Sequence, residues 1–377
     1  AKAQKLPAAE LTKRQKAVAD HAKKAPAPTP AMTLALGPTR PTHVMIRGDF
    51  LRKGVAVEPG FLGALKTPGA GTTRLDLARW LVAPENPLTA RVAANWVWAK
   101  LFGRGLVTTP EDFGVQGERP THPELLDWLA TEFVRTRWDL KGLHRLIVTS
   151  ATYRQSSHVT PLLAERDPQN RLLARASRYR IEAELVRDLA LAVSGLLSSK
   201  LGGPSVFPPQ PPGVSSEGAY GPLAWNVSQG EDRYRRGLYT FSKRTAPYAM
   251  FATFDAPSGE ACLARREVSN TPLQALTLLN DAVYIEAAQK LGQSAAAMSA
   301  SDGERASQLF GRILTRPPSN DERAALASYL AEQRKCLAAG QLDAKAISGG
   351  EESAVERAAW TLVARALLNL DETITRE

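Results

Sequence analysis

The chain has 377 residues, of which 44% are hydrophobic and 23% charged, and its formal net charge is +10. A hydrophobic fraction of this size can form a core, which excludes disorder for most of the chain. No run of about 18 apolar residues occurs, which excludes a transmembrane helix. The first residues also lack the apolar run of a secretion signal, so a signal was removed, was never present, or lies on another part of the protein.

The positive charge is concentrated at the N-terminus. Residues 1–24 contain six lysines and Arg14 against Glu10 and Asp20, so half of the net charge lies there. The remainder is only mildly basic, which disfavours nucleic-acid binding. We expect this stretch to be a polar helix or disordered, and the alternating prolines that follow to form a stiff connector. A basic leader and Pro-rich linker is therefore predicted over 1–42.

The stretch 43–201 is predicted to be the N-terminal helical part. It opens with a short β-prone segment, His43–Arg47. Thr73 is expected to cap a first helix. Pro87 is expected in the first turn of a second helix, which Gly103 ends.

Three more helices are predicted in this part from apolar residues at steps of three and four. They cover about 125–133, 140–151 and 181–196. Thr121 and Glu124 fit a capping box at the start of the first of them, with a proline inside its first turn.

The middle of the chain is rich in glycine and proline. Residues 202–230 hold six glycines and six prolines, a density that regular structure does not tolerate. A loop of this length in a compact protein is commonly functional, a linker or disordered. Gly237–Phe241 is the best strand candidate after it. The range 202–244 is therefore predicted to be a Gly/Pro-rich loop with a short strand.

The range 245–377 is predicted to be the C-terminal helical part. Capping boxes at Thr271–Gln274 and Ser319–Glu322 begin two of its helices, and the first is expected to continue through Ile285. A last amphipathic helix is predicted over about 354–370.

Taken together, these elements predict a mainly α fold. We expect an irregular multi-helix bundle with a few short strands and the long Gly/Pro-rich loop. The domains either follow the ranges given above or merge into one domain over 43–377.

The sequence contains no motif for a metal or cofactor. The five histidines lack the spacings of metal ligands, and no Cys-x-x-Cys pair or haem-attachment motif occurs. We therefore expect no metal site and no cofactor in this chain. Cys262 and Cys336 are expected to be two buried thiols, or a single disulfide bond if the protein is exported.

Acid–base chemistry has three candidate residues, Asp112, His122 and Asp255. An enzyme that uses them must bring them together in one pocket. The structural alternative is strong for His122, because it falls in the exposed first turn of a predicted helix. The chain is thus compatible with an enzyme or a non-enzyme at this stage.

Ligand binding has its best candidates around the Gly/Pro-rich loop. Arginines beside aromatic side chains suit sugars and acidic glycans, whereas the alternative is a set of ion pairs inside the protein. The candidate binding residues are Arg233, Arg235, Arg236, Arg244, Trp225 and Tyr239, with Tyr220 and Tyr234 beside them.

Several segments together resemble a known family. They are Thr73–Leu81, Glu85–Arg91, Phe102–Val107, Asp112–Gly114, Gly117–Asp127, Leu143–Ile147, Ser150–Gln155, Phe254–Pro257, Cys262, Arg265–Arg266 and Asn270–Leu276. The chain resembles planctomycete-specific domain one, a family of unknown function, over about 43–370. It departs from the family at Trp96, where an Arg is typical, and at Asp371–Thr373, which lacks the usual aromatic or aliphatic third residue.

The resemblance implies where the protein is located and which domains accompany it, but it implies no reaction. Such domains form the C-terminal part of large exported planctomycete proteins, so we expect a periplasmic or cell-surface module. The same resemblance implies upstream cytochrome-c-like domains as partners, with haem c bound only there.

Three functions follow as hypotheses. The first is an accessory module that binds a partner protein or an anionic polysaccharide. The second is a polysaccharide-acting enzyme with carboxylate and histidine acid–base groups. The third is a scaffold that positions an upstream haem for electron transfer.

Overall fold

The computed structural model describes residues 7–24, 32–33, 35, 37, 40–63, 65, 73–214 and 224–376. Within these residues the chain forms 15 α-helices and only two two-stranded sheets, which confirms the predicted mainly α fold. It divides into two compact units, Ala1–Gly63 with Pro68–Leu77, and Ala64–Thr67 with Ala78–Glu377. The boundary falls inside α2 (Arg74–Leu81). Tyr220 lies outside the described residues.

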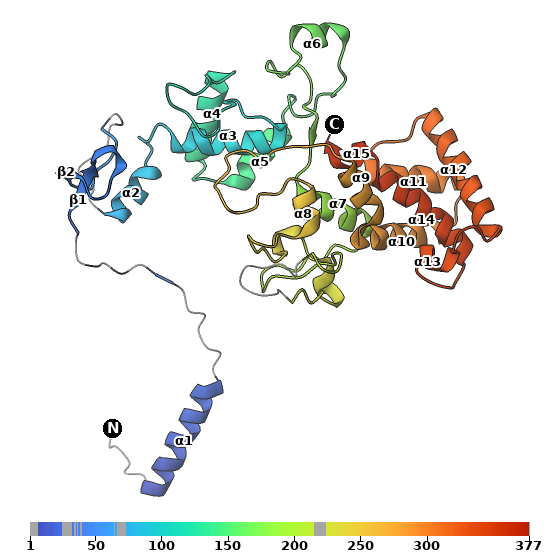
Figure 1. The fold of residues 1–377 in the computed structure, drawn as a ribbon, viewed down its shortest axis with the longest axis horizontal. Helices are drawn as coiled ribbons and strands as arrows, with labels where there is room; N and C mark the ends of the chain where they lie inside the picture. Colours follow the sequence, from blue (N-terminus) through green and yellow to red (C-terminus); the bar gives the residue numbers. More distant parts are fainter. Residues whose placement is uncertain are drawn as a thin grey trace. The chain divides into compact units, whose positions relative to one another are not determined.

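The first unit contains a long helix near the N-terminus, α1 (Ala8–Lys24), shown in blue in Figure 1. Its exposure is high along its whole described length. The helical alternative predicted for the leader is therefore confirmed for these 17 residues.

The first unit also contains a β-hairpin. Strands β1 (Thr42–Met45) and β2 (Lys53–Val57) are antiparallel, with Thr42 opposite Val57, and a short 3-10 helix, η1 (Ile46–Gly48), starts the turn between them. The β-prone segment predicted near His43 is thus confirmed. In α2, Thr73 caps the helix as predicted, because its Oγ1 accepts from Asp76 N.

The second unit begins with three packed helices, α3 (Thr89–Phe102), α4 (Pro123–Arg135) and α5 (Leu140–Val148). Gly103 ends α3 with φ 73°, a left-handed conformation that glycine adopts without strain. The core of this group is formed by Ala94, Trp98, Phe102, Leu106, Val107, Leu126, Leu129, Phe133, Leu143 and Ile147.

Two predicted helix starts are wrong in detail. Thr121 does not cap α4, since its Oγ1 bonds to His122 Nδ1 and lies 3.4 Å from Leu106 O. Helix α3 begins after Pro87 rather than around it. Asn86 accounts for this, because its Oδ1 accepts from the two amides at the helix start, 2.9 and 3.1 Å away.

A short sheet joins the middle of the chain to its end. Strand β3 (Tyr179–Arg180) pairs antiparallel with β4 (Thr375–Arg376), which follows the short helix α15 (Asp371–Ile374). Helix α6 (Pro161–Arg166) precedes β3, and helix α7 (Ala183–Ser194) follows it.

The predicted strand at Gly237–Phe241 is wrong. The chain there forms 3-10 turns, η2 (Gly230–Tyr234) and η3 (Gly237–Tyr239), and only a single bridge joins Thr240 to Val206. The reason is that Asp188 on α7 accepts from Gly237 N at 2.6 Å, which curls the segment onto that helix instead of extending it.

The C-terminal helices form the larger core. Trp360 lies fully buried at its centre and donates from Nε1 to Glu356 at 2.8 Å. The helices are α8 (Ala249–Thr253), α9 (Pro272–Asn280), α10 (Ala282–Ala296), α11 (Asp302–Leu314), α12 (Asn320–Ala338), α13 (Ala344–Ser348) and α14 (Ala354–Leu368). The last long helix predicted by sequence corresponds to α14.

Both predicted capping boxes in this part are confirmed, at the starts of α9 and α12, and a third at Ser301–Glu304 begins α11. The prediction that this helix continues through Ile285 is wrong, because α9 ends at Asn280 and the helical structure breaks at Asp281. There the carboxylate accepts from Val283 N and starts α10 as a new helix.

Candidate functional site

Of the arginines predicted to bind a ligand, Arg233 and Arg235 lie among protein groups, whereas Arg236 and Arg244 are exposed. Arg233 holds Glu286 of α10 through two bonds, one of them 3.1 Å long from Nε. Arg236 Nε lies 3.4 Å from the carboxylate of Asp188. Arg244 is exposed.

Arg235 is almost fully buried and organises the Gly/Pro-rich loop. Its guanidinium donates to the main-chain oxygens of Lys200, Gly202 and Pro204. The same group lies 3.7 Å from the ring centroid of Tyr239, in a cation–π contact. The start of the loop, at Gly202 and Pro204, is therefore folded around this cation.

Trp225 also packs inside the protein. Its Nε1 donates to Pro208 O at 2.7 Å, and its ring stacks on Tyr248 with the two ring planes 3° apart. Phe207 meets it edge to face. The indole is thus held between the loop and α8.

Arg187 is the residue that sequence reasoning missed. It is fully buried on α7, where it donates from Nη2 to Arg233 O at 2.9 Å and from Nη1 to Arg235 O. Burial lowers the pKa of Arg187. The sequence signal that could have indicated its burial is its position on the apolar face of α7, one turn from both Ala183 and Leu191.

The acid–base candidates have separate hydrogen-bond partners. Asp112 accepts from Gly114 N at 2.7 Å in the loop between α3 and α4. His122 Nδ1 bonds to Thr121 Oγ1 at 3.0 Å at the start of α4.

Asp255, after α8, is bonded to a loop residue. It accepts from Ser269 N at 2.8 Å and from Ser269 Oγ, and its φ of 60° places it in the left-handed region. A non-glycine residue held there needs local contacts to fix it. These bonds tie the end of α8 to the start of α9.

Among the described residues, no three His, Cys, Asp or Glu side chains gather closely enough to hold a metal ion. Cys262 and Cys336 are both free thiols. Cys262 is exposed and Cys336 half-buried, so the expectation of two buried thiols is wrong. None of the helices within the described residues combines the length and the apolar composition that a membrane span requires.

One polar pocket lies next to the predicted arginines. It has a volume of about 240 Å³ and is lined by residues of η2, of α10 and of the turn that connects α13 to α14. Its lining residues are Leu196, Tyr234, Glu286, Gln289, Lys290, Gln293, Ser348, Gly349 and Arg357.

The wall of this pocket is fixed by Gln289. Its Nε2 donates to Ile347 O at 3.2 Å, which ties α10 to the end of α13. Gly349 turns there with φ 72°, and a Cβ at that position would come within 3.0 Å of the Gln289 amide. A glycine is therefore needed for this turn to lie against α10.

The charges around the pocket are unevenly compensated. Glu286 is paired with Arg233, and Arg357 donates to Glu352 at 2.8 Å. Lys290 Nζ lies 3.3 Å from the neutral amide oxygen of Gln293. Burial, followed by the charge of Glu286, raises the pKa of Tyr234 further above its ordinary value of 10, at which the phenol is already a hydrogen-bond donor at neutral pH.

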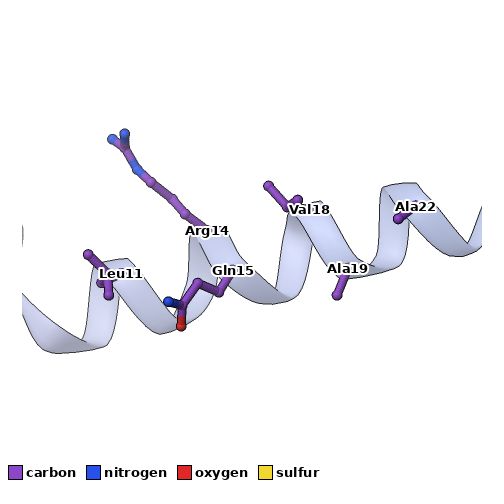
Figure 2. Close-up of a pocket in the computed structure, with 6 residues that line it drawn as sticks. All are labelled: Leu11, Arg14, Gln15, Val18, Ala19 and Ala22. Atoms are coloured by element: carbon purple, nitrogen blue, oxygen red, sulfur yellow. The ribbon is translucent and has the colours of Figure 1, made fainter.

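A second hollow runs along one side of α1. All of its lining residues come from this one helix, as Figure 2 shows: Leu11, Arg14, Gln15, Val18, Ala19 and Ala22. A single helix face does not enclose a ligand. The polar pocket is therefore the candidate site.

The comparisons with known proteins concern the second unit above all. The family model PSD1, described as a protein of unknown function (DUF1553), matches residues 73–330. No curated protein and no solved structure matches the chain. The family resemblance stated from the sequence is confirmed, and because the match covers well over half of its residues, the chain belongs to the PSD1 family of unknown function.

Proposed function

We propose that the chain is an accessory binding module, and that the polar pocket beside Arg233 takes an acidic sugar unit of a polysaccharide. The observation that supports this most directly is Lys290, a cation at the pocket whose side chain contacts a neutral amide. A ligand carboxylate or sulfate would supply the missing negative charge.

The other groups of the pocket suit a sugar. The Tyr234 hydroxyl and the Gln293 amide are neutral polar groups, and Leu196 adds an apolar contact. Sugar hydroxyls both donate and accept hydrogen bonds, as amide and phenol groups do. A volume of about 240 Å³ is at the small end for ligand pockets, which fits one sugar unit rather than a long chain segment.

The predicted arginines have an indirect part in this proposal. Arg233 neutralises Glu286, so the carboxylate does not repel an anionic ligand. Arg187 and Arg235 hold the main chain that carries Tyr234. These residues position the pocket rather than line it.

The test is calorimetric titration with uronate-containing and sulfated oligosaccharides at low salt, alongside neutral oligosaccharides of the same length. We expect binding of an anionic ligand only, with Lys290→Gln weakening it about tenfold. Lys335→Gln, an exposed lysine on α12, is the matched control and should leave the affinity unchanged. Equal affinity for neutral ligands, or no loss with Lys290→Gln, would overturn the proposal.

The wider setting belongs to the same proposal and rests on the family resemblance. We infer an exported protein, periplasmic or at the cell surface, in which cytochrome-c-like domains precede this module. Haem c would then be carried by those domains alone. Mass spectrometry of the native protein tests this, since it measures the full chain and any covalent haem.

A further inference from the structure

The β-hairpin of the first unit has an apolar tip that the hairpin itself does not cover. Phe50 and Leu51 follow η1 in the turn and are 73% and 77% exposed. They are consecutive residues in a tight turn, which Asp49 fixes by accepting from Leu51 N at 2.9 Å. Both exposed apolar side chains therefore belong to one fixed turn.

Three cations flank this tip along the chain, with one carboxylate, Asp49, inside the turn. Arg47 precedes it, and Arg52 and Lys53 follow it directly. All three are exposed, and within residues 40–63 the structure shows no ion pair for any of them. Two exposed bulky apolar side chains, flanked along the chain by three exposed cations, suit a surface that is apolar inside and negatively charged outside.

The backbone of the turn is strongly bent. Arg47 has φ 55° and Gly48 φ 77°, so two successive residues adopt left-handed conformations. The bend is closed by Ile46 N donating to Arg52 O at 3.0 Å. The bond holds the two ends of the turn together, with Arg47 before and Arg52 directly after the two apolar residues.

We infer that this tip, Phe50 and Leu51 with Arg47, Arg52 and Lys53, inserts into the surface of an anionic lipid bilayer. Apolar side chains at the tip would enter the boundary between headgroups and acyl chains, and the cations would contact lipid phosphates. Helix α1 in the same unit carries five further cations against two carboxylates, which adds attraction to the same surface. The inference is independent of the polar pocket.

The test uses the full chain and sedimentation with vesicles, either phosphatidylcholine alone or equal parts of phosphatidylglycerol and phosphatidylcholine. We expect binding to the anionic vesicles only. Phe50→Ser with Leu51→Ser should weaken this binding about tenfold, because the buried apolar area is lost. Val115→Ser with Leu172→Ser removes two exposed apolar side chains of the second unit and should have no effect.

A second variant tests the cations. Arg47→Asn, Arg52→Gln and Lys53→Gln are combined, with Asn at position 47 because it tolerates the left-handed backbone. Each lost cation is expected to weaken binding about fivefold. Thermal unfolding of both tip variants checks that they fold as the parent does.

Three results would overturn the inference. The first is no binding to anionic vesicles. The second is full binding by the Phe50→Ser, Leu51→Ser variant, which would mean adsorption by charge alone. The third is a lipid-free oligomer that this variant dissociates, which would make the tip a contact between copies of the chain.

Discussion

Arg187 Nη2 lies 2.9 Å from the main-chain oxygen of Arg233, 46 positions along the chain, and donates a hydrogen bond to it. The other terminal nitrogen donates to Arg235 O. One buried guanidinium on α7 therefore fixes the segment that carries three of the predicted binding arginines. This relationship explains why Arg233 and Arg235 lie against the protein, whereas Arg236 is exposed.

Arg187→Met is expected to lower the free energy of unfolding by about 2–4 kcal/mol. The methionine fills the space but leaves two buried carbonyl oxygens without their donor. Urea unfolding followed by circular dichroism measures the change. Arg145→Met, at an exposed position of α5, is the control and should change the value by less than about 0.5 kcal/mol. A loss below about 1 kcal/mol with Arg187→Met would contradict the structural role.

Gly292→Ala is expected to destabilise the C-terminal core. A Cβ at this position would lie 2.3 Å from Thr361 Oγ1 and 2.6 Å from Thr361 N, so α10 and α14 must separate. Overpacking of this kind costs roughly 1–3 kcal/mol. Gly303→Ala on α11 is a matched control, because nothing lies within 4 Å of its Cβ, and it should stabilise by about 0.5 kcal/mol. Differential scanning calorimetry compares the two, and equal Tm values would disprove the close approach.

The stability that Glu322 contributes is expected to disappear in acid. Two bonds from Arg316, 2.7 and 2.9 Å long, lower the pKa of Glu322 to about 2, below its ordinary value of 4.5. Because the folded pKa lies below the unfolded one, the contribution is present above about pH 4.5 and is lost as the pH falls toward 2.

The measurement is urea unfolding of the parent chain and Glu322→Gln over that pH range. The parent should be the more stable at neutral pH, and the two curves should converge at the acid end. Asp321→Asn removes the adjacent carboxylate of the same first turn and serves as control. A difference between the parent and Glu322→Gln that does not change with pH would refute the linkage.

Asp255 and Ser269 are expected to act as one structural pair. Asp255→Asn and Ser269→Ala should each lower the free energy of unfolding by about 1–2 kcal/mol, since both changes remove the charge-assisted bond between Ser269 Oγ and the Asp255 carboxylate, whereas the bond from the main-chain Ser269 N does not depend on the serine side chain. The double variant should lose less than the sum of the two, as a double-mutant cycle would show. Full additivity would show that the contact contributes nothing, and would return Asp255 to the acid–base candidates.

The sequence predicted the helices well wherever their ends depend on neighbouring residues. The boxes that start at Thr271 and Ser319 join residues three positions apart, so no distant contact is needed to form them. Thr121 has the same pattern and fails, because its hydroxyl bonds to His122 and lies against Leu106 O instead. A local pattern is thus overridden when a distant group competes for the same hydroxyl.

For the candidate site, in contrast to the helices, the sequence indicated the neighbourhood but not the residues that line the pocket. Charge and aromatic content marked the neighbourhood of Arg233 from sequence, and the polar pocket does lie beside it. The pocket's own residues on α10 and after α13 carried no such signal, because Lys290 and Ser348 are ordinary helix residues until the fold brings them together. Their arrangement around the pocket depends on contacts that span more than 50 positions.

The sequence alone determined that the chain is mainly helical, that its charge is concentrated at the N-terminus, and that it belongs with a family of unknown function. These properties follow from local spacing and composition. Only the tertiary structure decided that Arg187 and Arg235 are buried and that the start of the Gly/Pro-rich loop, at Gly202 and Pro204, folds around a guanidinium. The physical reason is that burying an arginine requires several carbonyl oxygens at once, and those oxygens come from segments far apart in the chain.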